Sequence, residues 1–197
     1  MIAVVDYGMG NLRNIRQAFR ELGQEALITH DREALAEASK LVLPGVGAFG
    51  EAVRRIEGLG IRDLLVAHAT SGRPLLGICL GMQLLFEESE ESPGARGLGV
   101  LAGRVRKFSG GIKIPHVGWN EVRPEGPSRC FPDPAARPCF YFVHSYKVEP
   151  VPETIGVTDY GGLFSAAVQR GNITGFQFHP EKSQDAGLDL LRMFSAS

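Results

Sequence analysis

The sequence predicts an α/β fold with a mostly parallel central sheet, flanked by helices and extended by additional antiparallel strands in the C-terminal half. Short apolar segments alternate with helix-like segments through the first half of the chain, whereas the second half is rich in β-type segments separated by Gly, Pro and Asn. Strand–helix alternation is typical of βαβ units and a parallel sheet. With 197 residues, 44% of them hydrophobic, we expect one domain over residues 1–197.

The elements of the first half follow from apolar runs and helical spacing. Residues 2–5 form a short apolar run that predicts a buried strand, and residues 11–22 place apolar side chains at helical spacing before Gly23, which fits a helix stop. Further strands are expected at residues 26–28, 41–43 and 74–78. Further helices are expected at residues 32–38, 61–69 and 80–88.

The second half predicts mainly strands and one closing helix. Strands are expected at residues 100–108, 119–122, 140–148, 155–160, 166–169 and 173–179. Residues 186–194 have helical spacing. The Pro- and Gly-rich segment 124–138 is interpreted as a surface loop and not as a domain boundary.

The charge and hydrophobicity of the chain exclude several classes of function. The formal net charge is −1, from 21 basic and 22 acidic side chains, and no basic stripe of the kind that binds nucleic acid is present. The longest apolar stretch, residues 75–86, is shorter than the about 20 residues that a membrane span needs. The apolar opening segment is too short for a secretory signal. We therefore expect a soluble, cytoplasmic protein that binds neither nucleic acid nor a membrane.

Three widely spaced cysteines, Cys79, Cys130 and Cys139, predict neither a disulfide framework nor a zinc site. We accordingly expect no metal and no cofactor. Only Cys79 lies in a suggestive context, and the other two are interpreted as ordinary reduced thiols.

Cys79 lies between two glycines, where a predicted strand meets a predicted helix. The segment Gly77-Ile-Cys79-Leu-Gly81 has the pattern glycine–x–nucleophile–x–glycine, with cysteine where hydrolases of this design carry serine. A sharp strand-to-helix turn requires small residues on both sides of the nucleophile. The helix N-terminus would stabilise a thiolate, and the Leu80 N–H would donate to an oxyanion. The pattern indicates a nucleophile, and the alternative is a structural cysteine at a tight turn.

The candidate base is His179, which ends the last predicted strand and precedes Pro180 and Glu181. Proline keeps its neighbours extended, and residues two apart in an extended backbone share a face. Glu181 can therefore reach one imidazole nitrogen while the other points toward a nucleophile, as in catalytic triads. Alone, His-Pro-Glu fits a surface turn equally well. Together with the cysteine turn, it predicts a Cys79–His179–Glu181 triad.

The cysteine turn and the His-Pro-Glu segment together resemble the class I (triad) glutamine amidotransferases. Further stretches resemble, more narrowly, the glutaminase subunits that serve imidazole glycerol phosphate synthesis in histidine biosynthesis. These stretches are residues 6–14, 44–50, 113–120 and 142–146. The resemblance runs nearly end to end and shows no departure at the triad. It implies an enzyme that hydrolyses glutamine to glutamate and ammonia and passes the ammonia to a synthase.

The resemblance also implies a role for individual residues. Cys79 would attack the glutamine amide, His179 would protonate the departing ammonia, and water would hydrolyse the thioester. The implied substrate-binding and oxyanion positions are Gly45, Val46, Gly47, Leu80, Gln83, His144, Ser145 and Tyr146. From the residues alone, these glycines also fit a strand-exit turn, and the polar residues also fit ordinary helix and strand positions.

The partner that the resemblance implies is the cyclase subunit of imidazole glycerol phosphate synthase, in a heterodimer. Ammonia released into neutral water becomes protonated and is no longer a nucleophile, so an ammonia donor should dock on its acceptor enzyme. The implied interface positions are Asn11, Asn14, Trp119 and Lys182, with residues 110–120 as a candidate docking segment. For Lys182, a solvated surface lysine is the alternative.

Three other functions remain open from the sequence. The chain could deliver ammonia to a different synthase, although residues 7–11 and 117–120 argue against it. It could be a stand-alone cysteine hydrolase, which would be fully active without an acceptor enzyme. A non-catalytic regulatory or nucleotide-binding module with a vestigial Cys79 is the third alternative. The intact Cys79, His179 and Glu181 argue against it, and Arg13 replaces the third glycine of the nucleotide-binding fingerprint that begins at Gly8.

Overall fold

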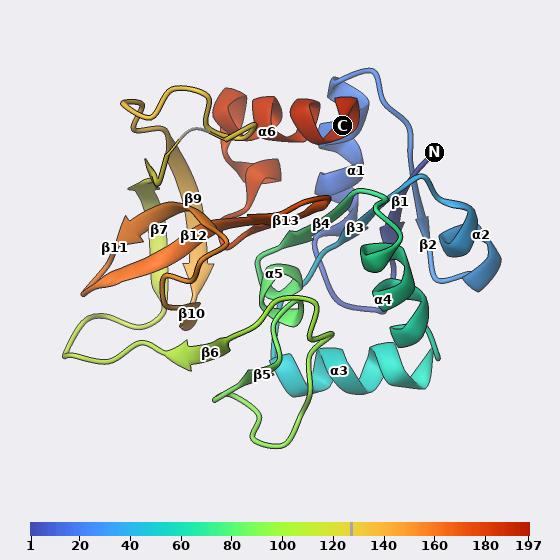
Figure 1. Cartoon of the computed structure of the whole chain (residues 1–197), viewed down its shortest axis with the longest axis horizontal. Coiled ribbons are helices and arrows are strands. Elements are labelled where there is room, and N and C mark those ends of the chain that lie inside the picture. Colours follow the sequence, from blue (N-terminus) through green and yellow to red (C-terminus); the bar gives the residue numbers. More distant parts are fainter. Residues whose placement is uncertain (127) are drawn as a thin grey trace.

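The computed structural model describes residues 1–126 and 128–197, and its centre is a twisted eight-stranded sheet (Figure 1). The strand order is β2-β1-β3-β4-β13-β12-β11-β8. Neighbours from β2 to β13 are parallel, whereas β12, β11 and β8 continue the sheet in antiparallel pairs. The predicted fold class is therefore confirmed. The strands are β1 (Ile2–Val5), β2 (Ala26–Thr29), β3 (Lys40–Leu43), β4 (Leu75–Ile78), β8 (Arg123–Pro124), β11 (Thr154–Asp159), β12 (Leu163–Arg170) and β13 (Ile173–Phe176).

Helices cover both faces of the parallel part, as a sheet buried on both sides requires (Figure 1). One face packs against α1 (Leu12–Glu21) and α6 (Gln184–Ala196). The other face packs against α2 (Arg32–Glu37), α3 (Phe49–Gly58), α4 (Arg62–Thr70) and α5 (Leu80–Leu84). Successive residues of β1 face opposite sides, which explains why the strand is apolar throughout. Val4 packs on the side of α1 and α6, and Ala3 and Val5 pack on the side of α2 to α5. No described helix is long and apolar enough to cross a membrane.

Two smaller sheets lie beside the central one. Strands β5 (Glu88–Ser89), β6 (Arg104–Lys107) and β10 (Tyr146–Val148) form the first, and β7 (His116–Glu121) pairs antiparallel with β9 (Cys139–His144) to form the second. The His179 N–H donates to the Tyr141 carbonyl at 2.9 Å. This bond ties β9 to the segment that follows β13, so the second small sheet is attached to the candidate base.

Several predicted elements differ in extent from the observed ones. Helix α3 was not predicted, although its buried residues Phe49, Ala52, Val53 and Ile56 have helical spacing. Helix α5 ends at Leu84, because the Leu84 carbonyl accepts from the Leu98 N–H at 2.7 Å instead of continuing the helix. The predicted strand at 100–108 is reduced to β6, and the one at 140–148 divides at Ser145 into β9 and β10. Strand β7 begins three residues earlier than expected, and β8 takes Pro124 from the expected loop.

Candidate active site

Cys79 occupies a strained turn between β4 and α5. Its φ is 54° and its ψ is −110°, a conformation that non-glycine residues rarely adopt and that commonly marks functional sites. The Cys79 N–H donates to the Phe176 carbonyl of β13 at 2.7 Å, and the Cys79 carbonyl accepts from the Gln83 N–H at 3.2 Å. The residue therefore both ends the sheet ladder and begins the helix, which holds its side chain at the carboxyl end of the parallel strands.

The two glycines around Cys79 are required by close backbone contacts. A Cβ on Gly77 would lie 2.7 Å from the Gly81 carbonyl oxygen, and a Cβ on Gly81 would lie 1.8 Å from the Leu43 carbonyl oxygen. Both neighbours are backbone atoms that cannot swing away. The steric reason that the sequence suggests for the two glycines is thus confirmed.

Replacing Gly81 by alanine is expected to lower the free energy of unfolding by more than about 4 kcal/mol, since a buried backbone contact cannot relax locally. Urea unfolding followed by circular dichroism measures the change. The matched control is Gly58→Ala at the end of α3, where an added Cβ meets nothing within 4 Å and alanine favours the helix. Equal unfolding midpoints for the two variants would contradict the packing argument.

His179 and Glu181 form a buried pair. His179 Nδ1 lies 2.9 Å from Glu181 Oε1, and the side chains are 2% and 0% exposed. The same Glu181 oxygen accepts from Asn11 Nδ2 at 3.2 Å. The predicted contact is present, but the extended backbone expected beyond His179 is wrong, because Pro180–Lys182 forms a 3-10 turn (η1). Within the described part of the chain, the buried His179 Nε2 makes no hydrogen bond.

The surroundings of His179 favour its protonated form. Burial alone lowers the pKa of His179, but the neighbouring Cys79 sulfur and the Glu181 carboxylate outweigh it and raise the pKa to about 10. This environment therefore favours an imidazolium at His179, beside the Cys79 side chain. The geometry is therefore suited to a thiolate–imidazolium pair with Glu181 as the orienting carboxylate.

The glycine-rich loop after β3 lies directly against the cysteine turn. A Cβ on Gly45 would lie 2.6 Å from the Tyr7 hydroxyl oxygen and 2.8 Å from Leu80 Cβ, and Gly47 has a φ of 99°. The Tyr7 hydroxyl donates to the Pro44 carbonyl at 2.6 Å and holds the start of the loop. Gly47 thus serves the turn, and Gly45 allows the loop to approach Leu80 and the Gly81 backbone closely.

A cavity of about 360 Å³ opens beside Cys79, in the size range of small-molecule sites. Its walls include most of the expected substrate-binding and oxyanion positions: Val46, Gly47, Leu80, Gln83, His144, Ser145 and Tyr146. Gly45, His179 and Glu181 are not among the lining residues. Two larger hollows, of about 720 and 730 Å³, lie elsewhere on the surface, and neither combines a cysteine with a histidine among its described residues.

Glu91 also lines the cavity, and the sequence interpretation missed it. Its carboxylate accepts from the Phe49 N–H at the start of α3 at 2.7 Å. No motif marks this residue, because its place depends on how the segment after α5 folds back. It supplies the cavity with a negative charge at a helix N-terminus.

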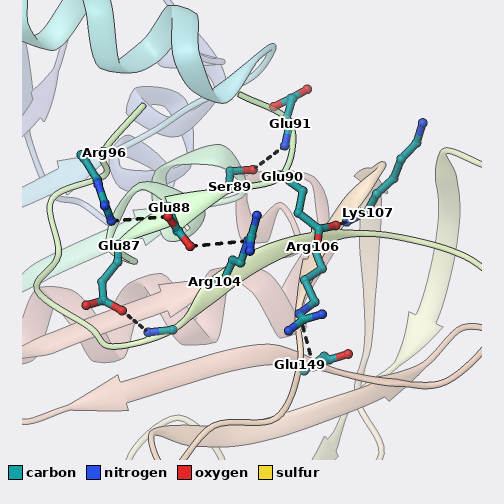
Figure 2. A network of polar contacts seen from close by, with 11 residues as sticks. Glu87, Glu88, Ser89, Glu90, Glu91, Arg96, Arg104, Arg106, Lys107 and Glu149 are labelled. Atoms are coloured by element: carbon teal, nitrogen blue, oxygen red, sulfur yellow. Dashed lines mark hydrogen bonds and ion pairs between the residues drawn. The ribbon is translucent and has the colours of Figure 1, made fainter. Parts of the chain in front are cut away.

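A network of charged side chains holds the segment that carries Glu91 (Figure 2). Glu88 pairs with Arg96 at 3.4 Å and Arg104 at 3.6 Å, while the Glu90 carboxylate accepts from the Lys107 N–H at 3.0 Å. Exposed ion pairs contribute little stability one by one. Together with the β5–β6 pairing, they nevertheless fix the path of the chain toward the cavity.

Two buried histidines support the wall that His144, Ser145 and Tyr146 form. His144 Nδ1 lies 2.8 Å from the Tyr146 carbonyl oxygen, and its Nε2 lies 3.0 Å from His116 Nδ1. Since the carbonyl can only accept, His144 carries its proton on Nδ1 and His116 donates to it. Burial lowers the pKa of His144 to about 3 and that of His116 to about 4, so both rings are neutral.

These neutral histidines predict a loss of stability in acid. Unfolded histidines bind protons below about pH 6.5, whereas the folded rings resist protonation down to about pH 4, so unfolding takes up protons as the pH falls. The free energy of unfolding should therefore decrease by a few kcal/mol from pH 7 to pH 4. Urea titrations across this range should show a weaker pH dependence for His116→Phe, and the wild-type dependence for His30→Gln at an exposed site. Equal slopes for all three proteins would contradict the assignment.

The four expected interface residues lie near the His179–Glu181 pair or near Tyr141, whose carbonyl accepts from the His179 N–H. Trp119 is 49% exposed and packs edge-on against Tyr141 at 6.1 Å, and Lys182 Nζ lies 5.8 Å from the centre of the same Tyr141 ring. Asn11 contacts Glu181, and Asn14 lines a small hollow that also contains Glu181. The structure thus brings these residues around the outer side of the His179–Glu181 pair.

Comparison with known proteins identifies the class. The chain belongs to the family described as glutamine amidotransferase class-I, whose model matches residues 3–195. A solved structure described as a glutamine amidotransferase superposes with a TM-score of 0.78 at 22% identity and covers 99% of this chain and 100% of that one. PurLQS from Thermotoga maritima gives a TM-score of 0.76 at 19% identity and covers 99% of this chain and 97% of that one. These structures confirm the fold.

Curated relatives point to a more specific group within this class. The imidazole glycerol phosphate synthase subunit HisH of Methanothermobacter thermautotrophicus is 50% identical over 98% of this chain and 97% of that protein. The proteins of the same name from Syntrophotalea carbinolica and Aquifex aeolicus are 45% and 46% identical and cover 98% and 97% of this chain, and 98% and 94% of their own lengths. The predicted membership of the class I amidotransferases, and the likeness to this glutaminase subunit, are confirmed.

Proposed function

We propose that this chain is the glutaminase subunit of an imidazole glycerol phosphate synthase and that Cys79, His179 and Glu181 carry out the hydrolysis. Membership of the amidotransferase family and the HisH relatives support the activity. The observation that supports the assignment of residues is the strained Cys79 turn, whose side chain lines the cavity and neighbours His179 of the buried His179–Glu181 pair.

In the proposed reaction, the Cys79 thiolate attacks the side-chain amide carbon of glutamine and forms a tetrahedral intermediate. His179 gives its proton to the amide nitrogen, which leaves as ammonia, and a thioester remains on Cys79. A water molecule then attacks the thioester carbon while His179 takes its proton, and glutamate departs as the thiolate reforms. Glu181 keeps the imidazole oriented through the 2.9 Å bond to Nδ1.

The cavity offers complementary groups for glutamine. The Leu80 N–H at the start of α5 and the backbone of the Pro44–Gly47 loop stabilise the oxyanion. The Glu91 carboxylate matches the α-ammonium group of the amino acid, and Gln83 and the Ser145–Tyr146 segment complete the walls. Among the described residues, no group of three or more His, Cys, Asp or Glu could hold a metal ion, and the proposed hydrolysis needs none.

The proposal includes a cyclase partner in a heterodimer and a single domain over residues 1–197. Exposed apolar side chains at Ile114, Val117 and Trp119 lie on and beside β7, and Trp119 and Lys182 both approach the Tyr141 ring. Docking there would deliver ammonia without release into bulk water. The complex as a whole would act as a lyase, and the glutaminase as a hydrolase. The three free thiols fit a reducing, cytoplasmic location.

The experiment that tests the proposal measures glutamate release from glutamine by the purified chain, alone and with a matching cyclase and its ribonucleotide ligand. We expect weak activity alone and a strong increase with the loaded cyclase. Strong activity alone that the cyclase does not change would overturn the partner and indicate a free-standing amidase. Stimulation only by a different synthase would indicate another ammonia acceptor.

A further inference from the structure

Gln177 is a fully buried polar residue next to the nucleophile, and the reaction described above does not use it. It follows β13 and lies two residues before His179, and both side chains lie beside Cys79, whereas Phe176 and Phe178 belong to the apolar core. The Gln177 side chain is 0% exposed, and its Nε2 lies 3.8 Å from Cys79 Sγ. A buried amide in this position must have hydrogen-bond partners to offset its desolvation.

The orientation of the Gln177 amide is fixed by a backbone group. Gln83 Nε2 lies 3.1 Å from the Tyr146 carbonyl oxygen, which can only accept, so this end of Gln83 is the NH₂ group. The same NH₂ group donates to Gln177 Oε1 at 3.0 Å. Because the Gln177 oxygen faces Gln83, its NH₂ group faces the sulfur. The Tyr146 carbonyl also accepts from His144, which anchors the chain of hydrogen bonds to the cavity wall.

We propose that Gln177 is a further catalytic residue, whose side-chain amide donates a hydrogen bond to the Cys79 thiolate and stabilises it before attack. The proposal rests on the proposed function, since it takes Cys79 as the nucleophile. The other neighbour of the sulfur, the Val143 carbonyl at 3.8 Å, can accept only from the protonated thiol. The Gln177 amide, like His179, therefore stabilises the thiolate form of Cys79, whereas the Val143 carbonyl can stabilise only the thiol form.

Other titratable groups surround the sulfur and stay unchanged in the test. His179 and Tyr7 interact electrostatically with Cys79, and His144 and Glu91 line the same cavity. A change in the ionisation of Cys79 in variants of Gln177 alone therefore reports on this one amide.

The test is the pH dependence of Cys79 alkylation by iodoacetamide, followed by mass spectrometry of the Cys79 peptide, which separates it from Cys130 and Cys139. Gln177→Met removes the donor, and we expect the alkylation midpoint to rise by about one pH unit. Gln177→Glu keeps an acceptor for Gln83 but places a carboxylate beside the sulfur, so the midpoint should rise further. If Gln177 had a purely structural role, the midpoint should change less in Gln177→Glu than in Gln177→Met, because Glu preserves the bond to Gln83.

Glutaminase kinetics in the complex with the cyclase provide the second readout. For Gln177→Met, we expect kcat to fall about tenfold and the KM for glutamine to change less than about twofold. Gln169→Met, on β12 and away from Cys79, is the matched control and should keep both values.

If Gln177→Met does not fold, Gln83→Met provides a second variant. It removes the group that orients Gln177 and should raise the alkylation midpoint by less than the rise of about one pH unit expected for Gln177→Met. Unchanged midpoints would overturn this proposal, whereas failure of the wild-type protein to release glutamate would overturn the proposed function instead.

Discussion

Replacing Cys79 by alanine is expected to reduce glutamine hydrolysis by at least about 10⁵-fold, because a thioester needs a thiol and Cys79 supplies the one thiol among the described residues that line the cavity. Cys79 contributes one sulfur to a cavity wall, so the fold should tolerate the loss. Glutamate release in the presence of the loaded cyclase measures the effect. Cys139→Ala is the matched control, since this thiol is exposed and lies on β9.

The complex itself provides the control for assembly. Ammonium salt at alkaline pH supplies the cyclase with free ammonia, so the Cys79→Ala complex should form imidazole glycerol phosphate from ammonia but not from glutamine. This pattern separates a chemical defect from a failure to dock. Residual glutaminase activity above about one hundredth of the wild-type value would contradict the role of Cys79 as the nucleophile.

Most parts of the site that the sequence predicted depend on local geometry. Gly77 is required by its contact with the Gly81 backbone within one strand–turn–helix unit, whereas Gly81 is required by the Leu43 carbonyl of the neighbouring strand β3. His179 and Glu181 are two residues apart, so their 2.9 Å contact depends on one short segment, even though that segment is a 3-10 turn and not extended. A strand–helix alternation likewise predicts a parallel sheet from neighbouring segments alone.

The parts that the sequence did not predict depend on distant segments. Glu91 reaches the cavity only because the β5–β6 pairing folds its segment against the start of α3. Gln177 becomes informative only when Gln83 and Tyr146, from two other elements, set the orientation of its amide. Helix α5 was predicted too long for the same reason, since the bond from Leu98 that ends it comes from a later loop. Spacing along the chain carries no signal for such contacts.

Replacing Glu181 by glutamine is expected to lower kcat about 10³-fold and to leave the KM for glutamine nearly unchanged, because Glu181 does not line the cavity. Both His179 Nδ1 and Asn11 Nδ2 lie against the same oxygen, Oε1. The glutamine oxygen can accept from both donors, so the tautomer of His179 should survive and the loss should come mainly from the missing negative charge. Steady-state glutaminase kinetics in the presence of the loaded cyclase measure both constants.

The pH profile distinguishes loss of charge from loss of orientation. The Glu181 carboxylate raises the pKa of His179, so its removal lowers that pKa, and the alkaline limb of the kcat profile should move to lower pH. Glu181→Ala removes the acceptor as well, so its kcat should fall further and need not follow a shifted profile. Glu149→Gln, which affects an exposed pair with Arg106 (Figure 2), controls for the loss of a carboxylate as such. A Glu181→Gln enzyme with a wild-type profile would show that Glu181 orients His179 without acting through its charge.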